Sequence, residues 1–133
     1  MPFAKLTLQD DRISEATLQS LHGRLVELLV RILDKEPSVT SVLIERVPTE
    51  CWTVGGCAVA PAAHLEVKIT MGTNSKEEKA AFVSAAWRLL SEAVSGLPTA
   101  TYIVIHEVPA TSWGYEGITQ AERKVGRNAT DTA

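Results

Sequence analysis

The stretch VPTECWTVGG (residues 47–56) returns 61 residues later as VPATSWGYEG (residues 108–117). The valine, the proline, the tryptophan and the final glycine of the two stretches coincide without a gap. The same offset superimposes Ser14 on Ser75, Leu28-Leu29 on Leu89-Leu90, Pro37 on Pro98, and Ile44 on Ile105. Because tryptophan is a rare residue, its match in register indicates a tandem duplication.

Each half contains the same pair of expected strands. Alternation of apolar and polar residues predicts the first strand of each half over residues 3–8 and 65–70. The second strands are expected over residues 40–47 and 101–108. Because a helix separates the two strands of a half, each half is predicted to be a β-α-β unit with parallel strands and a right-handed crossover.

The helix between the strands has start and stop signals in both halves. Ser14 and Ser75 are predicted N-caps, and residues 75–78 (SKEE) have the spacing of a capping box. Pro37 and Pro98 follow the helix ends, where proline prevents continuation. The apolar stripes expected to face the sheet are Leu18, Leu21, Leu25, Leu28, Leu29 and Ile32 in the first helix and Val83, Ala86, Trp87, Leu90 and Val94 in the second.

These elements predict an α/β (α+β) fold in which two tandem β-α-β units form a four-stranded sheet with two helices on one face. One domain over residues 1–133 is expected, built from the repeats 2–60 and 63–120 and ending in a tail, 121–133, that is frayed after Arg123. The glycine-rich ends of the repeats are expected to form short hairpins. The other sheet face would be bare and apolar around Leu43 and Val104, which implies an oligomer.

Composition narrows the function classes. The 133 residues carry 13 Lys and Arg against 16 Asp and Glu, and the resulting charge of −3 argues against a general nucleic-acid binder. The most apolar helical stretch, residues 25–33, is interrupted by Glu27 and Arg31 and is too short to span a membrane. The N-terminus lacks the pattern of a signal peptide, so a cytoplasmic protein is expected. Cys51 and Cys57 are expected to be free thiols, although they could in principle pair.

A proline directly after the initiator Met, heading a strand in a duplicated β-α-β chain, resembles the tautomerase superfamily. Arg12 follows Pro2 by ten residues, and each second strand leads through Trp52 or Trp113 to a glycine-rich end. Over residues 2 to about 120, the chain is most similar to 4-oxalocrotonate tautomerase duplicated and fused into one chain. The resemblance implies the fold shared with macrophage migration inhibitory factor, and a homotrimer with its sheets facing inward.

The expected chemistry depends on Pro2, which becomes a secondary amine once Met1 is removed. A free α-amino group titrates at about 7.7–8.0, and a nearby cation or partial burial lowers that pKa. Such an amine can remove a proton alpha to a carbonyl, so the resemblance implies that Pro2 is the general base. The alternative is that Pro2 is a harmless N-terminal residue.

Arg12 is the residue that the resemblance implies for substrate binding. Its guanidinium would hold a carboxylate bidentately and would lower the pKa of Pro2. The alternative is that Arg12 pairs with Asp10 or Asp11 as a solvated loop charge.

The aromatic residues after the second strands are implied to be walls of a pocket. Trp113, with Tyr115 beside it, would line the pocket of Pro2 and exclude water from the amine. Trp52 would occupy the corresponding place of the other half. Core packing is the alternative for these residues, and it is the expectation for Trp87 on its helix.

The second half departs from the family pattern. The positions of Pro2 and Arg12 map to Ala63 or His64 and to Thr73 or Asn74, respectively. The second half has therefore lost the base and the cation together, and one active site is expected in each chain.

Two further residues resemble the macrophage migration inhibitory factor branch. The second carboxylate-binding arginine of the family maps to Ser41 and to Tyr102, and a tyrosine at that place reaches in from a neighbouring subunit in this branch. Tyr102 could donate a hydrogen bond to a carbonyl or enolate oxygen. Lys35 resembles the pocket lysine of the same branch. The loss of the second arginine argues against a dicarboxylate substrate.

The leading hypothesis is a cofactor-free keto–enol tautomerase that acts on a small carboxylate-bearing enol or 2-oxo acid. One alternative is a promiscuous superfamily member with hydratase-like activity, in which protonated Pro2 is an acid. The other is a non-catalytic trimeric scaffold or binding module. No histidine pair has metal-ligand spacing and no phosphate loop is present, so neither a metal nor a cofactor is expected. No nucleic-acid or membrane partner is expected either.

Overall fold

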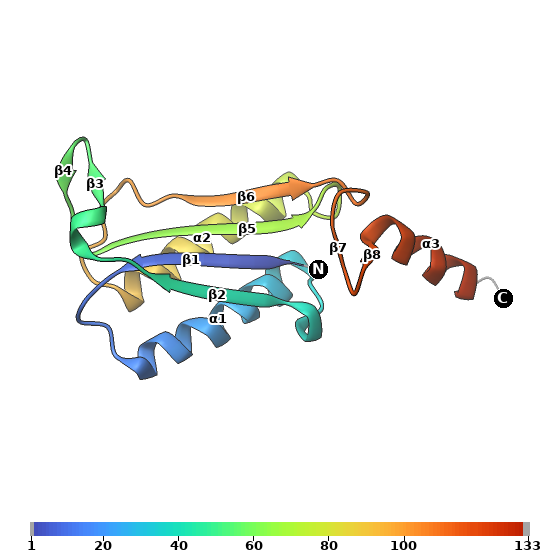
Figure 1. Ribbon diagram of the computed structural model, residues 1–133, viewed down its shortest axis with the longest axis horizontal. Coiled ribbons are helices and arrows are strands. Elements are labelled where there is room, and N and C mark those ends of the chain that lie inside the picture. Colours follow the sequence, from blue (N-terminus) through green and yellow to red (C-terminus); the bar gives the residue numbers. More distant parts are fainter. Residues whose placement is uncertain (1, 132–133) are drawn as a thin grey trace.

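A single four-stranded sheet forms the centre of the molecule (Figure 1). The computed structural model describes the backbone of residues 2–131 and the side chains of residues 2–126. The strands of the sheet are β1 (Phe3–Gln9), β2 (Ser41–Arg46), β5 (Ala62–Thr70) and β6 (Ile103–Val108). They lie in the order β2-β1-β5-β6, and the pairs β1–β2 and β5–β6 are parallel, as predicted. The two halves meet through the antiparallel pairing of β1 with β5.

Two helices cover one face of this sheet, which confirms the predicted layer arrangement (Figure 1). Helix α1 (Glu15–Leu33) begins after Ser14, whose side chain accepts a 3.1 Å hydrogen bond from the backbone N–H of Thr17. Helix α2 (Lys76–Ala93) begins after Ser75 with the complete capping box. Capping satisfies backbone donors that have no partner inside the helix, so the local signals in the sequence locate both helix starts correctly.

The core lies between the helices and the sheet. The stripe of α1 is buried largely as predicted, with Leu21, Leu25, Leu28 and Leu29 facing the sheet. The prediction for α2 is partly wrong, because Val83 and Trp87 are 38% and 37% exposed. The residues of α2 that do face the core are Phe82, Ala86, Leu89 and Leu90. The true stripe is rotated relative to the predicted one, so that Phe82 takes the interior position and Trp87 lies at the margin.

Two short hairpins close the halves, as the glycine-rich ends predict. The first pairs β3 (Thr53–Val54) with β4 (Cys57–Ala58), and the second pairs β7 (Gly114–Tyr115) with β8 (Ile118–Thr119). Gly114 leaves no room for a side chain, because a Cβ atom there would overlap the backbone of Ile118. Two 3-10 turns, Pro37–Val39 and Thr49–Cys51, complete the connections.

The tail forms a helix where the sequence analysis expects a frayed segment. Helix α3 (Gln120–Asp131) extends away from the sheet beyond the β7–β8 hairpin (Figure 1). Its start is fixed by Thr119, whose Oγ1 accepts a 3.1 Å hydrogen bond from the backbone N–H of Glu122. The run from Gln120 to Lys124 consists of good helix formers, which outweigh the glycine and threonines that follow. Residues 132–133 of the expected tail lie outside the described residues.

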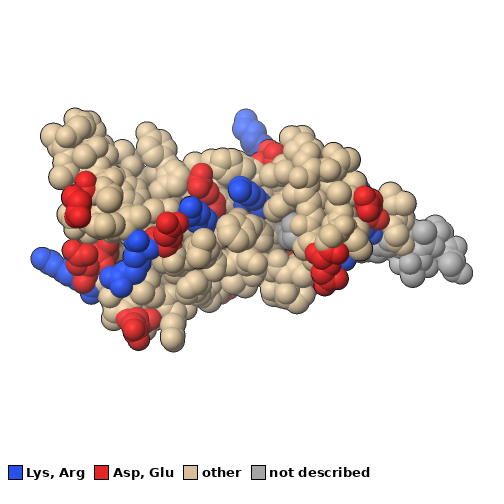
Figure 2. Space-filling model, viewed as in Figure 1, with Lys and Arg blue, Asp and Glu red and all other residues tan. Residues whose placement is uncertain are grey.

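The open face of the sheet is not the apolar surface that the sequence analysis expects. Leu43 is 45% exposed there, but charged side chains of both signs lie across the same face (Figure 2). Lys5 forms an ion pair with Glu45 at 3.1 Å. The reason is strand alternation: β1 and β5 turn their aliphatic residues towards the helices, so their polar residues are left on the open side. The predicted bare apolar face is therefore wrong, and it gives no reason for an oligomer.

The two cysteines and the helices bear on two other predictions. Cys51 and Cys57 are both exposed and unpaired. Within the described part of the chain, the helices fall short of the combined length and apolarity needed to cross a membrane.

Candidate functional site

A pocket of about 540 Å³ opens where β1 begins. Pro2, which is buried, lies directly before β1, and the β7–β8 hairpin brings Trp113 and Tyr115 to the same place. The residues that line the pocket are Pro2, Phe3, Val39, Ser41, Lys68, Trp113, Gly114 and Tyr115. The structure thus brings together three of the residues that the sequence analysis selected, from opposite ends of the chain.

The two aromatic side chains are attached to different neighbours. The indole Nε1 of Trp113 donates a 3.1 Å hydrogen bond to Oγ1 of Thr70, the last residue of β5. Tyr115 lies under Arg123 of α3, whose guanidinium carbon is 3.8 Å from the ring centroid. The same guanidinium donates a 2.7 Å hydrogen bond to the carbonyl oxygen of Tyr115. Arg123 was missed by sequence reasoning, because nothing in the tail indicates that it folds back onto the hairpin.

Lys68 is a second residue that sequence reasoning missed. It lies on β5 directly opposite Phe3, so its side chain stands on the open face of the sheet beside the start of β1. The alternation of β5 does place Lys68 on that face. Its proximity to Pro2 follows only once the antiparallel pairing of β1 with β5 is known.

Arg12 does not join Pro2 in this pocket. It is exposed in the loop after β1, and its backbone N–H donates a 3.0 Å hydrogen bond to Oδ1 of Asp10. Seven of the nine residues between the two positions form β1 (Phe3–Gln9), and at about 3.3 Å per residue the strand spans about 20 Å from its first residue to its last. The expected grip of Arg12 on a substrate at Pro2, and its effect on the pKa of Pro2, therefore have no basis within one chain.

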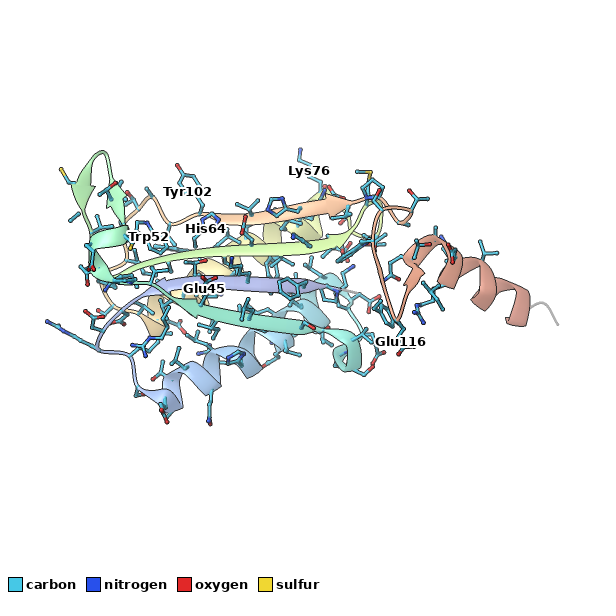
Figure 3. The ribbon with its side chains drawn as sticks, viewed as in Figure 1. Glu45, Trp52, His64, Lys76, Tyr102 and Glu116 are labelled. Atoms are coloured by element: carbon cyan, nitrogen blue, oxygen red, sulfur yellow. The ribbon has the colours of Figure 1, made fainter. Side chains whose placement is uncertain are left out.

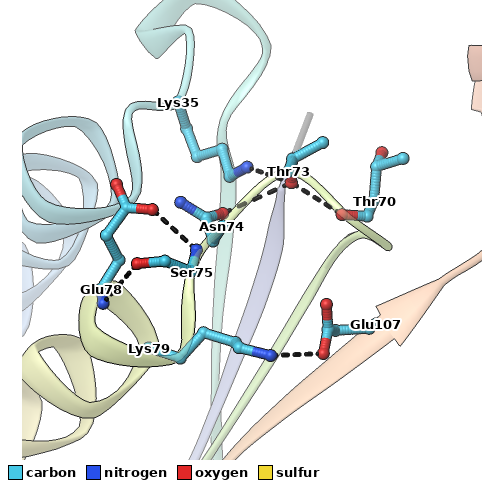
Figure 4. Close-up of polar contacts among 8 residues, drawn as sticks. All are labelled: Lys35, Thr70, Thr73, Asn74, Ser75, Glu78, Lys79 and Glu107. Atoms are coloured by element: carbon cyan, nitrogen blue, oxygen red, sulfur yellow. Dashed lines mark hydrogen bonds and ion pairs between the residues drawn. The ribbon is translucent and has the colours of Figure 1, made fainter.

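The loop that does lie at the Pro2 end is the one that follows β5, because β5 runs antiparallel to β1. It contains Thr73 and Asn74, the positions to which the arginine of the first half maps. Lys35 donates a 2.9 Å hydrogen bond to Oγ1 of Thr73 (Figure 4). Asn74 donates one of 2.9 Å to the carbonyl oxygen of Leu33. This loop is therefore joined to the end of α1 by polar contacts.

Lys35 lies at the expected end of the molecule but not among the residues lining the pocket. It is only 8% exposed, and this burial lowers the pKa of its ammonium. The nearby carboxylates of Asp34 and Glu78 act in the opposite direction and raise that pKa, but by less. Through the hydrogen bond from its Nζ to Thr73, Lys35 holds the loop after β5 in place.

Tyr102 is placed away from the Pro2 pocket of its own chain. It is 65% exposed at the start of β6 and lies near His64, while Glu116, at the tip of the β7–β8 hairpin, lies towards the opposite end (Figure 3). Trp52 lies at the same end as Tyr102, beside the β3–β4 hairpin (Figure 3). Tyr102 can therefore contact a substrate at Pro2 only from a second copy of the chain.

A second pocket, of about 490 Å³, surrounds Arg12 at the far end of β1. Asp10, Asp11 and the buried Gln9 also line it. Asp11 accepts a 3.2 Å hydrogen bond from Thr49, so this end of the sheet is acidic as well as basic. Among the described side chains, no three His, Cys, Asp or Glu residues are grouped so that they could hold a metal ion.

Comparison with known proteins gives consistent matches. The family model for tautomerase enzymes matches residues 64–122. Probable tautomerase K2 of Dickeya dadantii (strain 3937) is 34% identical over 59 residues, which is 44% of this chain and 88% of that protein.

Solved structures match over almost the full length. A symmetric trimer of wild-type fused 4-OT, Q0, has a TM-score of 0.83 at 17% identity, over 91% of this chain and 98% of that one. The structure of Pt0534 inactivated by 2-oxo-3-pentynoate has a TM-score of 0.81 at 17% identity, over 94% and 99%. At these identities, the structural matches establish the fold.

Proposed function

Because the chain belongs to the tautomerase family, we propose that it is a cofactor-free keto–enol tautomerase whose general base is the amine of Pro2, formed when Met1 is removed. The observation that carries the proposal is the pocket in which Pro2, Trp113 and Tyr115 meet. A secondary amine at the start of a strand is held in position by the sheet, and aromatic walls exclude water from it.

The proposed reaction needs only one base. The amine of Pro2 takes the hydroxyl proton of the enol, and the electron pair of that O–H bond forms the carbonyl. The double-bond carbon that does not carry the hydroxyl then takes a proton from the resulting ammonium. This step restores the neutral amine. The reverse sequence removes a proton alpha to the carbonyl. An amine whose pKa is lowered towards neutral pH can perform both steps.

A small enol or 2-oxo acid is the proposed substrate class. In support, a structural neighbour, Pt0534, is inactivated by 2-oxo-3-pentynoate, which is itself a 2-oxo acid. Because Tyr102 lies away from the Pro2 pocket of its own chain, we place it at the substrate from a second copy of the chain.

A homotrimer is the proposed assembly, since the neighbour Q0 is a symmetric trimer. Sedimentation at micromolar concentration should give three times the mass of the 14.4 kDa chain. A monomer under those conditions would refute the assembly.

The activity is tested with phenylenolpyruvate, whose ketonisation is followed by absorbance. The wild type should accelerate the reaction, and Pro2→Ala should lose most of the acceleration while it keeps the thermal unfolding midpoint. Equal activity of the two proteins, or none in either, would contradict the proposal and would leave a scaffold or binding role.

A second measurement tests the amine itself. The nitrogen of Pro2 should add to the triple bond of 2-oxo-3-pentynoate at C4, with a proton delivered to C3, so the chain gains the full mass of the reagent. N-terminal peptide mass should show Met1 absent and the label on Pro2. A retained Met1 in the active protein would rule out an amine base at this position.

A further inference from the structure

We propose that Lys68 is the residue that binds the substrate carboxylate in the Pro2 pocket and that it thereby selects monocarboxylic enols and 2-oxo acids. This inference rests on the proposed tautomerase function. It gives to a residue of β5, in the second half of the chain, the role that the family resemblance implies for Arg12.

The position of Lys68 is the first observation. Among the residues that line the pocket, all of which the structure describes, Lys68 alone carries a formal charge. Residues directly opposite in an antiparallel pair have Cα atoms about 4.5–5.5 Å apart, and Lys68 is opposite Phe3, the neighbour of Pro2. A lysine side chain of ordinary length therefore reaches a substrate that contacts the nitrogen of Pro2.

The second observation is that the ammonium group of Lys68 is available for a ligand. Its side chain has no hydrogen bond or ion pair with the described residues, whereas Lys5 on the same face is paired with Glu45 at 3.1 Å. Glu66, the nearest carboxylate along β5, accepts a 3.2 Å hydrogen bond from His106. An ammonium with no partner beside an apolar pocket is available to an incoming anion.

The third observation excludes the other cations near the site. Lys35 donates to Thr73 and does not line the pocket. Arg12 lies about 20 Å away, beyond the far end of β1. Lys79 forms a 2.6 Å ion pair with Glu107. Arg123 contacts the ring and the carbonyl oxygen of Tyr115 and does not line the pocket. A carboxylate held near Pro2 therefore finds its counter-charge in Lys68.

The chemistry of the pocket indicates the substrate class. A lysine ammonium is a compact charge that suits one carboxylate, and no second cation lines the pocket to hold another. The remaining wall, formed largely by Trp113, Tyr115 and Phe3, suits an apolar or aromatic substituent. In a 2-oxo acid the carboxylate is adjacent to the reacting carbonyl, so Lys68 also stabilises the enolate that forms next to it.

Lys68→Met tests the inference, because it keeps the length of the side chain and removes the charge. For phenylenolpyruvate, KM should rise about 10- to 100-fold, the range for losing a hydrogen bond to a charged group. For the methyl ester of phenylenolpyruvate, which has no carboxylate, KM should change less than twofold. Lys68→Arg should restore most of the loss. Lys5→Met is the matched control, since it removes a cation from the same face that is already paired.

The possible results separate this inference from the proposed function. If Pro2→Ala abolishes activity while Lys68→Met leaves KM for the acid within twofold, the role of Lys68 is wrong and the tautomerase assignment stands. If Lys68→Met raises KM for acid and ester by the same factor, measured at a pH above the acidic limb of both proteins, its charge does not bind the carboxylate and the inference fails. If Pro2→Ala is as active as the wild type, the proposed function fails first and takes this inference with it.

Discussion

The indole nitrogen of Trp113 and the hydroxyl of Thr70 are joined by a 3.1 Å hydrogen bond that connects the β7–β8 hairpin to the end of β5. Because β5 is antiparallel to β1, the end of β5 lies beside Pro2. The wall of the pocket is therefore held by the second half of the chain, while Pro2 comes from the first half. In the proposed function, the second half of the chain therefore encloses the amine that Pro2 of the first half provides.

Thr70→Val should weaken this wall without removing an aromatic side chain. It leaves the indole N–H of Trp113 without its partner, at a cost of about 1 kcal/mol. We expect KM for phenylenolpyruvate to rise about fivefold, with kcat little changed. Thr7→Val is the control, since the hydroxyl of Thr7 has no hydrogen bond with the described residues. A KM equal to that of the wild type in Thr70→Val would show that the bond does not position Trp113.

Arg123→Ala should loosen Tyr115. The substitution removes both the stacking contact at 3.8 Å and the 2.7 Å hydrogen bond to the carbonyl oxygen of Tyr115. A cation–π contact is worth about 0.5–1 kcal/mol at an exposed site, so KM for aromatic enols should rise two- to fivefold. Lys124→Ala, which removes an exposed neighbouring charge, should have no such effect. If both variants behave alike, general charge at the tail explains the result and Arg123 does not position Tyr115.

Phe82→Ala and Trp87→Ala test which residues of α2 form the core. Phe82 is fully buried, and truncation of a buried phenylalanine costs about 3–5 kcal/mol. Trp87 is 37% exposed at the margin of the helix, so its truncation should cost clearly less. Urea unfolding measures both free energies. A larger loss in Trp87→Ala would mean that the predicted stripe, and not the observed one, faces the sheet.

Sequence reasoning succeeds here where the signal is local. Ser14 and Ser75 locate the helix starts because capping depends on residues three apart. The tryptophan repeat reveals the duplication, and hence the two parallel strand pairs. The stripe of α2 is harder, because Phe82 and Val83 both fit a helical period and only the sheet decides between them.

The candidate site shows why the rest needs the structure. The spacing of Pro2 and Arg12 is a real feature of the chain, but it measures distance along an extended strand and not across the sheet. Lys68 is 66 positions from Pro2, and it becomes a neighbour only through the pairing of β1 with β5. Nothing in the local sequence around Lys68 indicates this long-range pairing.

Lys79→Met should reduce stability in a pH-dependent manner. The hydrogen bond and the 2.6 Å ion pair with Lys79 lower the pKa of Glu107 (Figure 4). A carboxylate whose pKa is lowered by folding stabilises the native state at pH values above the pKa of the unfolded state, about 4.3. This contribution is lost as the pH falls through the lower pKa of the folded state. The variant should therefore unfold at a lower temperature than the wild type at pH 7, and the difference should shrink below about pH 4. A difference that stays constant down to pH 2 would contradict this linkage.

Lys68 and Arg12 should act differently on the pH dependence of kcat/KM. If the amine of Pro2 is the base, the acidic limb of the profile reports its protonation in the free enzyme. At an effective dielectric of about 20, a cation about 7 Å away contributes roughly 2 kcal/mol before screening, or about one to two pKa units. Lys68 shares the pocket with Pro2, so Lys68→Met should move the acidic limb upward by about one unit. Arg12 is about 20 Å away along β1, beyond the screening length of about 8 Å, so Arg12→Ala should leave the limb in place.

The titratable groups that face Lys68 need their own control. His106 lies opposite Lys68 on β6, and Glu66 and Lys5 are nearby on the same face. Because a histidine can also produce an acidic limb, His106→Gln is included, and it should not displace the limb. If Arg12→Ala moves the limb and Lys68→Met does not, the arginine reaches Pro2 from a second copy of the chain. The cation of the site would then belong to the assembly and not to β5.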